Sequence, residues 1–248
     1  MYKRQVLTQP EKGSITLSGS VFTYEPYLNM TGSDRFTYCV TDENGSCSAP
    51  AEIRLDISAS VMSVSFADMK DNPNHYAAVK LCEKGILSGE KSGSLNLFYP
   101  DQGVTRGEFA VMLVNAAKLS GSVAPCVNTG LLDDSDIPLW QKPYIKAALD
   151  AGIVTGNRLS GLEVITRAEA VVMASRAASL PDVPQTPIEV QDAAGIPDWA
   201  LQSYRNLTAY QMVDFYDGSA HPSMELRRDH AADLLWQLWK YKDSVPAK

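Results

Sequence analysis

The sequence predicts a multidomain protein in which a small all-β unit precedes an all-α unit of three repeats. Two observations carry this prediction. The first is an apolar alternation of period two across residues 6–58, which is typical of short antiparallel strands. The second is the equal spacing (167 − 106 = 61 and 228 − 167 = 61) of three arginines that each open a predicted helix, Arg106, Arg167 and Arg228. Such a period indicates one structural unit used three times.

The β unit is predicted from four alternating segments with turn residues between them. Residues 14–17, 21–24, 35–40 and 51–57 alternate apolar and polar side chains, and Gly, Asn, Asp and Pro separate them. Four or five strands in about 55 residues suit a small sandwich, close to the lower size limit for an independently stable unit.

The four cysteines are too few for a disulfide scaffold. Cys39 and Cys47 flank the turn at residues 42–45, where they either face each other as a disulfide or remain two thiols, because sequence does not fix hairpin register. Cys82, in a predicted helix, and Cys126, in a linker, are expected to be free. Neither is expected to be catalytic, since no suitably placed His and Asn accompany them.

After a polar break at residues 58–60 the apolar spacing becomes helical. We therefore predict a β unit at 1–60 and a helical unit at 61–248, with repeats at about 65–120, 131–180 and 189–241. Each repeat has an acidic turn, an aromatic residue that opens a first helix, a stop, and the arginine that opens a second helix. The turns contain Asp68, Asp134 and Asp192; the aromatic residues are Tyr76, Trp140 and Trp199; the stops include Gly89 and Gly156, and residues 211–213 replace the stop in the third repeat.

These motifs resemble two bacterial families. Residues 13–17, 22–26, 31–38 and 40–45 resemble the Ig-like, cadherin-like repeats of large surface proteins, which act as spacers. Residues 65–241 resemble three S-layer homology repeats, through the Phe-x-Asp opening at 66–68, the Gly-Ile-x-x-Gly stops at 85–89 and 152–156, and the Thr-Arg-x-Glu helix starts at 105–108 and 166–169.

The second resemblance implies a pseudo-threefold helical bundle, with the second helices at its centre and grooves between neighbouring repeats. It also implies non-covalent anchoring of an extracellular protein to secondary cell wall polysaccharide, which is often pyruvylated. The third repeat departs most, because Arg227 stands in place of the Thr and His230 in place of the Glu. Its own groove, with Arg228, is therefore expected to match the family least.

The helix starts separate structural residues from candidate ligand residues. Thr105 with Glu108, and Thr166 with Glu169, match the capping box, which explains these four residues without a ligand. The arginines are not explained, because a cation at the first helical position meets the positive end of the helix dipole at a cost of about 0.3–1 kcal/mol. Either they bind an anion with free amides of the helix start, or they pair with the acidic turn of their own or a neighbouring repeat.

We predict that the ligand contacts come from the arginines, the acidic turns, the aromatic residues and the two glycines, which are Arg106, Arg167, Arg228, Asp68, Asp134, Asp192, Tyr76, Trp140, Trp199, Gly89 and Gly156. An aromatic face covers apolar sugar surface well, although helix packing is the alternative for these residues. The glycines alternatively serve only as turn residues at positive φ.

A metal site is not predicted. Some relatives of the Ig-like repeats bind calcium through loop acids, and Asp34, Asp42 and Glu43 are the candidates here. Calcium requires six or more oxygen ligands, and turn chemistry already explains Asp42. The histidines, His75, His221 and His230, are too scattered for a metal cluster.

Composition narrows the class of partner. The net charge of −7 argues against nucleic acid and against an anionic membrane surface. No apolar run is long enough to span a bilayer, and no nucleophile–base pair or phosphate loop is visible, so neither an enzyme nor a cofactor is predicted. We expect a non-catalytic anchor in a bacterial cell wall or S-layer, with passenger domains upstream. The competing hypothesis is a degenerate repeat scaffold that binds protein.

Overall fold

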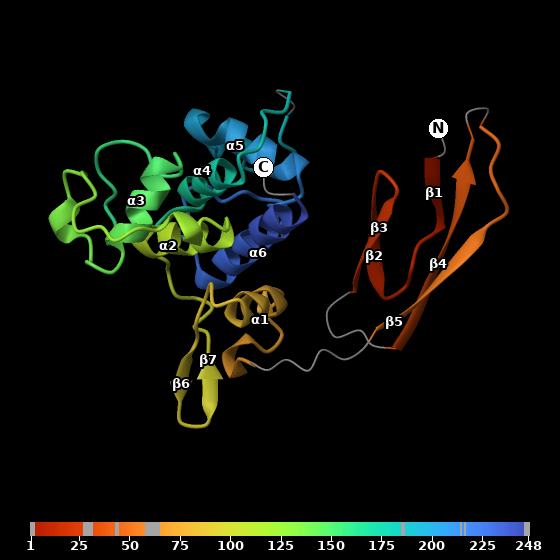
Figure 1. The fold of residues 1–248 in the computed structure, drawn as a ribbon, viewed down its shortest axis with the longest axis horizontal. Coiled ribbons are helices and arrows are strands. Elements are labelled where there is room, and N and C mark those ends of the chain that lie inside the picture. The colour runs from red at the N-terminus through yellow and green to blue at the C-terminus, as the bar shows by residue number, and fades with distance from the viewer. Residues whose placement is uncertain are drawn as a thin grey trace. The chain divides into compact units, whose positions relative to one another are not determined.

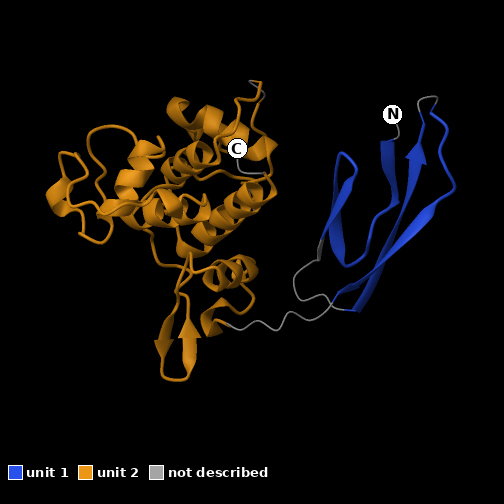
Figure 2. Cartoon of the chain, in the orientation of Figure 1, with its two compact units in different colours: residues 1–62 blue, residues 63–248 orange. Residues whose placement is uncertain are grey.

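The computed structural model describes residues 3–26, 32–42, 45–57, 65–184, 187–213, 215 and 217–245. The chain divides into two compact units, residues 1–62 and 63–248 (Figure 2). The break predicted at residues 58–60 lies outside the described residues. Each unit is described separately below.

The first unit contains five strands (Figure 1), which are β1 (Lys3–Thr8), β2 (Gly13–Ser18), β3 (Val21–Pro26), β4 (Gly32–Thr41) and β5 (Ala51–Ile57). β4 pairs antiparallel with both β1 and β5, and β2 pairs with β3 in a separate hairpin. The ring of Phe22 on β3 lies 5.3 Å from that of Phe36 and 5.1 Å from that of Tyr38, both on β4. The two sheets therefore pack face to face around aromatic side chains.

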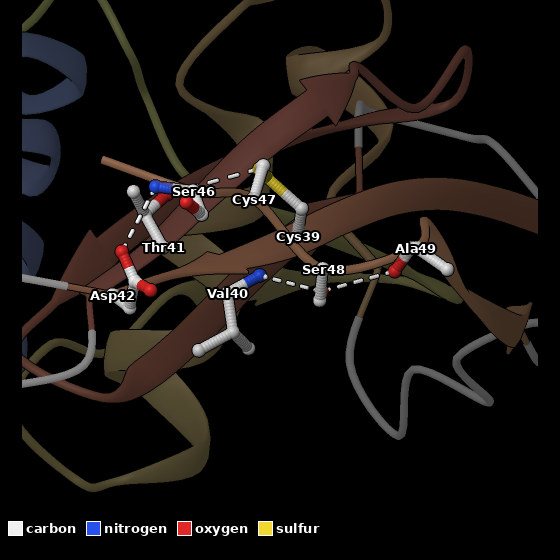
Figure 3. The surroundings of a disulfide bond; sticks show 8 residues. All are labelled: Cys39, Val40, Thr41, Asp42, Ser46, Cys47, Ser48 and Ala49. Carbon is white, nitrogen blue, oxygen red and sulfur yellow. Dashed lines mark hydrogen bonds between the residues drawn. A yellow bond between two sulfur atoms is a disulfide. The ribbon is translucent and has the colours of Figure 1, made fainter. Parts of the chain in front are cut away.

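A disulfide joins β4 to the segment that follows it (Figure 3). Cys39 and Cys47 are bonded, with their Cα atoms 6.0 Å apart. The backbone amide of Ser48 donates to the carbonyl of Val40 at 2.9 Å, and the Asp42 carboxylate accepts from the amide of Ser46 at 2.9 Å. Of the two alternatives left open by the sequence, the structure therefore has the disulfide.

Asp34 is a buried carboxylate that ties the loop after β1 to β4. It accepts bonds from the amides of Glu11, Lys12 and Arg35 and from the hydroxyl of Tyr24, at 2.7–3.0 Å. Burial acts to raise its pKa, but these four bonds outweigh burial and lower the pKa to about 2.

The same bonds bear on the candidate calcium site. Both carboxylate oxygens of Asp34 accept bonds from protein donors, and Oδ1 of Asp42 accepts from the amide of Ser46 in its own turn. Glu43 lies outside the described residues, and among those that are described no group of three or more His, Cys, Asp or Glu is placed to hold a metal ion.

The second unit contains six helices within its described residues, which are α1 (His75–Glu83), α2 (Arg106–Ala116), α3 (Lys142–Asp150), α4 (Arg167–Ala178), α5 (Asp198–Ala209) and α6 (Arg228–Ser244). None of these helices has the length and apolarity that crossing a bilayer requires. The sequence predicts an all-α unit, but this prediction is wrong for residues 90–97. A hairpin of β6 (Glu90–Ser92) and β7 (Leu95–Leu97) interrupts it, because Gly93 adopts a φ of 61° in a two-residue turn.

Three helices form the centre of this unit. α2, α4 and α6 contact one another, while α3 packs on α2, α5 on α4, and α1 on α6 (Figure 1). Each outer helix thus packs on the central helix that precedes it along the chain, and α1, which has no predecessor, packs on the last. The buried apolar residues Phe109, Val171 and Leu235 mark the core of the three central helices.

Backbone hydrogen bonds join the segments before the central helices in a closed ring, at the same spacing as the three arginines. The amide of Ile165 donates to the carbonyl of Val104, that of Leu226 to Ile165, and that of Val104 to Leu226, at 2.8–2.9 Å. A closed ring of this kind satisfies both the donor and the acceptor of each buried residue.

The starts of the central helices differ in their caps. Thr105 with Glu108, and Thr166 with Glu169, form capping boxes at α2 and α4. At α6 the N-cap is Arg227, whose side chain makes no capping bond. Asp229, which is 1% exposed, instead accepts a bond from the amide of His230 and from the side chain of Arg227.

Gln211 adopts the left-handed backbone conformation that a glycine adopts after the first helix of each of the other two repeats. Gly85 and Gly152 end α1 and α3 at φ values of 68° and 69°, and Gln211 ends α5 at 55°. A side chain in this left-handed region is strained.

Gln211→Gly is therefore expected to raise the free energy of unfolding of the helical unit by about 0.5–1 kcal/mol, measured by urea denaturation. The reciprocal Gly152→Gln serves as the control and should lower it; a loss of stability in Gln211→Gly would contradict the argument.

Candidate ligand-binding grooves

Arg106 reaches from the start of α2 to two glutamates of the following repeat. Its Nη1 lies 2.7 Å from Glu163 Oε2, and its Nη2 lies 2.6 Å from Glu169 Oε1. The second oxygen of Glu169 accepts the bonds of the capping box from Thr166. Burial acts to raise the pKa of Glu169, but the bonds from Thr166 and Arg106 outweigh it and hold the pKa below its usual range. The charge of Arg106 is therefore already compensated.

Arg167 makes the same kind of reach, but among the described residues no carboxylate lies within 4.0 Å of its guanidinium. Its Nε donates to the carbonyl of Ala220 at 3.0 Å, and its Nη1 lies 2.9 Å from Nδ1 of His230. Burial, helped by the positive charges of Arg167 and Arg227, lowers the pKa of His230 below 6.5, despite opposing charges on Asp229 and Asp233. His230 is therefore neutral at pH 7, with Nδ1 accepting the bond from Arg167.

Arg228 holds the loop of the first repeat. Its Nε donates to the carbonyl of Phe98 and its Nη2 to that of Ser88, both at 2.9 Å, and the guanidinium lies 4.8 Å from the centre of the Phe98 ring. The His230 that replaces the family's glutamate therefore alters the surroundings of Arg167, not those of Arg228. The expectation that His230 affects the groove of Arg228 therefore does not match the observed contacts, because each arginine reaches across a repeat boundary.

The expectation of free amides at the helix starts is also wrong. The amides of Arg106, Arg167 and Arg228 donate to the carbonyls of Glu163, Met224 and Gln102 at 2.9 Å. The amides one residue later are likewise bonded, to the carbonyls of Gly161, Pro222 and Pro100. These amides already donate to carbonyls of a neighbouring repeat, so they are not available to an anion. An anion at these helix starts would be bound by guanidinium groups and not by backbone amides.

The acidic turns bind the backbone of the loops that precede the central helices. Asp68 accepts from the amides of Phe98 and Tyr99, and Asp192 from those of Ala220 and His221, at 2.7–3.0 Å. The counterpart in the second repeat is Asp133, which accepts from Leu159 and Ser160. None of the three carboxylates pairs with the arginines, contrary to one of the two alternatives.

Asp134, which the sequence placed in this set, has a different role. Its carboxylate pairs with Lys142 Nζ at 2.6 Å and accepts from the amide and hydroxyl of Thr129. The side-chain bond from Lys142, followed by those from Thr129, lowers the pKa of Asp134 to about 2. Asp134 therefore fixes the start of the second repeat and not its loop.

A groove between α4 and α5 gathers three arginines around an exposed indole. We call this cavity of about 220 Å³ the arginine groove, and its lining includes Arg106, Arg158, Arg176, Glu169, Val172, Met173 and Trp199. Arg176 donates to the carbonyl of Ile153 and the hydroxyl of Thr155, and Arg158 is exposed. Within the described part of the chain, no carboxylate lies within 4.0 Å of the guanidinium of Arg158 or Arg176.

Sequence reasoning missed Arg158 and Arg176. A signal for Arg176 is present, since it is the only charged residue in the second half of α4, where the surrounding side chains are buried. Arg158 follows the glycine stop closely and has no such signal. Tertiary packing alone brings it beside Trp199, which belongs to the predicted third repeat.

The three predicted aromatic residues differ in their surroundings. Trp140 and Trp199 are 60% and 59% exposed, but Trp140 lies before α3, because Pro143 has no amide hydrogen and the helix begins only at Lys142. Tyr76 packs edge-on against Trp236, with ring centres 6.0 Å apart. Trp199 alone among them lines the arginine groove.

The two predicted glycines also differ from each other. Gly156 has a φ of 95°, as a turn residue would. Gly89 does not have positive φ, and a Cβ there would lie 2.3 Å from Cε1 of Phe66 and 2.7 Å from the carbonyl oxygen of Leu97. Close packing of the first repeat, and not a turn conformation, requires this glycine.

Comparison with known proteins identifies two segments. Residues 3–56 match the bacterial Ig domain, and residues 65–110 match the S-layer homology domain. These matches confirm the two resemblances for those residues, and a single S-layer homology domain is matched where three repeats were predicted. The second and third repeats stay a prediction.

Two curated relatives are similar over larger parts of the chain. An endoglucanase of Bacillus sp. (strain KSM-635) is 27% identical over 190 residues, and a surface-layer 125 kDa protein of Lysinibacillus sphaericus is 32% identical over 141 residues. The alignments cover 71% and 52% of this chain but only 19% and 11% of the relatives. The chain thus spans less than a fifth of either relative.

Proposed function

We propose that the helical unit is a non-catalytic anchor that binds an acidic polysaccharide of the bacterial cell wall through the arginine groove. The observation that carries this proposal is the pair Arg158 and Arg176, whose guanidinium groups have no carboxylate within 4.0 Å among the described residues, beside the exposed side chain of Trp199. Guanidinium groups bind carboxylates with charge-assisted hydrogen bonds, and an indole covers the apolar face of a sugar. A pyruvyl ketal on a sugar presents both features.

The similarity findings support a location at the cell surface. The match to the S-layer homology domain and the likeness to a surface-layer protein favour wall anchoring. The Cys39–Cys47 disulfide agrees with this, because disulfides persist mainly in oxidising, extracellular surroundings. In this proposal the β unit acts as a spacer next to the anchor.

We propose further that residues 65–241 are three S-layer homology repeats in a pseudo-threefold arrangement. The ring of hydrogen bonds through Val104, Ile165 and Leu226 supports this, since its equivalent atoms recur at the spacing of the three arginines. The second repeat keeps the Thr-Arg-x-Glu start at 166–169, whereas the third has Arg227 and His230 in place of the Thr and the Glu.

The likeness to an endoglucanase is consistent with a non-catalytic anchor. Only 19% of that relative aligns, so the aligned part need not hold its catalytic residues. In this chain, burial raises the pKa of the Cys82 thiol to about 11, which keeps the thiol protonated and unreactive near neutral pH. We propose that catalysis, where relatives have it, belongs to other domains.

The double variant Arg158→Ala/Arg176→Ala tests the proposal. We expect it to weaken binding to purified acidic wall polymer about 100-fold, which corresponds to two charge-assisted hydrogen bonds of about 1.5 kcal/mol each. Binding is measured by calorimetry with wild-type and variant chains, and circular dichroism checks that the variant is folded.

The matched control is Lys70→Ala/Lys91→Ala, which removes the same charge from exposed positions of the same unit outside the groove. If the control variant binds the polymer as weakly as the groove variant, the loss of binding comes from the change in net charge and not from the groove. Binding to walls stripped of polysaccharide would favour the protein-binding scaffold instead.

A further inference from the structure

Residues of the third repeat that differ from their counterparts in the second repeat line one pocket. This pocket of about 490 Å³, which we call the amide pocket, is lined by Asn74, Thr208, Gln211, Met212, Asp233 and Gln237, among others. Asn74 precedes α1, and the other five residues come from the end of α5, the turn after it and α6. The pocket therefore lies where the third repeat meets the first.

The amide pocket corresponds to the arginine groove by residue position. Gln237 follows Arg176, and Asp233 follows Val172, at the spacing of the three helix-opening arginines (237 − 176 = 61 and 233 − 172 = 61). Both members of each pair line their respective cavities. A smaller adjoining cavity of about 30 Å³ shares Met212 and Asp233 and adds Arg167 and His230.

The two sites differ in charge. The guanidinium of Arg176 is replaced by the carboxamide of Gln237, whose Nε2 donates to Asp233 Oδ1 at 3.2 Å. An apolar valine is replaced by the carboxylate of Asp233, and Glu169 is replaced by His230, which bonds Arg167 at 2.9 Å. A carboxylate-bearing ligand would lose one guanidinium here and meet a like charge on Asp233.

The same lining suits an uncharged sugar. Carboxamides and a hydroxyl both donate to and accept from sugar hydroxyl and N-acetyl groups, and a carboxylate accepts from sugar hydroxyl and amide groups. Thr208 and Gln211 are exposed, while Met212 is buried and supplies an apolar floor. We propose that the amide pocket binds an uncharged, hydroxyl-rich sugar, so that the helical unit recognises two chemically different sugars, one acidic and one neutral.

The inference rests on the proposed function, namely that this unit binds wall polysaccharide. Two methionines allow the two sites to be followed separately, since Met173 lines the arginine groove and Met212 lines the amide pocket. The full chain is labelled with ¹³C at its methionine methyl groups. Met173→Leu and Met212→Leu assign the two signals.

Two probes differ mainly by a carboxylate. N-acetylglucosamine is neutral, and N-acetylmuramic acid is the same sugar with a lactyl carboxylate. Each is titrated to tens of millimolar. We expect N-acetylglucosamine to shift the Met212 signal at least about threefold more than N-acetylmuramic acid does, and the order to reverse at Met173.

The variant Asp233→Val/Gln237→Arg gives the amide pocket the residues of the arginine groove. It should make the Met212 signal respond to N-acetylmuramic acid; the single variant Gln237→Arg serves if the double variant does not fold. No Met212 response to the neutral sugar, or a response no larger than to the acidic sugar, overturns the inference. A Met173 signal that ignores N-acetylmuramic acid counts against the proposed function instead, whatever Met212 does.

Discussion

Asp133→Ala is expected to lower the free energy of unfolding of the helical unit by about 3 kcal/mol. The carboxylate is 6% exposed and accepts from the amides of Leu159 and Ser160. Alanine leaves both amides without an acceptor in the loop before α4, and each orphaned buried amide costs about 1–3 kcal/mol. Urea denaturation followed by tryptophan fluorescence measures the change, since all four tryptophans lie in this unit.

The neighbouring Asp134→Ala is the matched control. It removes the pairing with Lys142 and the bonds from Thr129, which are nearer the surface, so a smaller loss is expected. The two variants differ by one position and remove the same charge. A loss in Asp134→Ala equal to that in Asp133→Ala would refute the assignment of Asp133 as the counterpart of Asp68 and Asp192.

Gly89→Ala is expected to lower the free energy of unfolding of the helical unit by about 3 kcal/mol, because the added methyl group overpacks the core. The new Cβ would lie 2.3 Å from the Phe66 ring and 2.7 Å from the carbonyl oxygen of Leu97. Phe66 is itself 2% exposed and packs on Phe98, with ring centres 5.2 Å apart, so the ring has little room to move. Thermal and urea unfolding, read by tryptophan fluorescence, should show the loss.

Gly85→Ala separates overpacking from backbone strain. Gly85 has a φ of 68°, but a Cβ there would meet nothing within 4 Å. Only the left-handed conformation is penalised, at about 1 kcal/mol. If Gly85→Ala proved as costly as Gly89→Ala, close packing would not be the reason for the glycine at position 89.

Local patterns in the sequence were enough to predict many of the helices and strands. The alternation at residues 35–40 and 51–57 gave β4 and β5, and the capping boxes at Thr105 and Thr166 gave the starts of α2 and α4. The hairpin β6–β7 escaped prediction, because strands of three residues are too short to show an alternation. The elements that were predicted, and the hairpin that was not, were both judged from patterns that extend over only a few residues.

The contacts between repeats could not be predicted in this way. Asp133 and Asp134 are adjacent and chemically identical, and only a loop 26 residues onward (159 − 133 = 26) distinguishes them. The partner of Arg106 lies 63 residues away at Glu169, and His230 changes the surroundings of Arg167 because the helices pack across repeat boundaries. Residue spacing records which positions are equivalent but not which repeat each side chain reaches.

The hydrogen bond from Val104 to Leu226 has a consequence for the number of repeats. An open stack of repeats can lose or gain a member at its end, because each unit touches only its neighbours. In the proposed arrangement of three repeats the third is also the neighbour of the first, so deleting any one would expose two interfaces, and inserting a fourth would break one. A chain cut in the linker at residues 123–128, with its original ends joined by a flexible segment, would keep all three interfaces. The copy number is therefore set by geometry, while the order in which the copies are encoded is not.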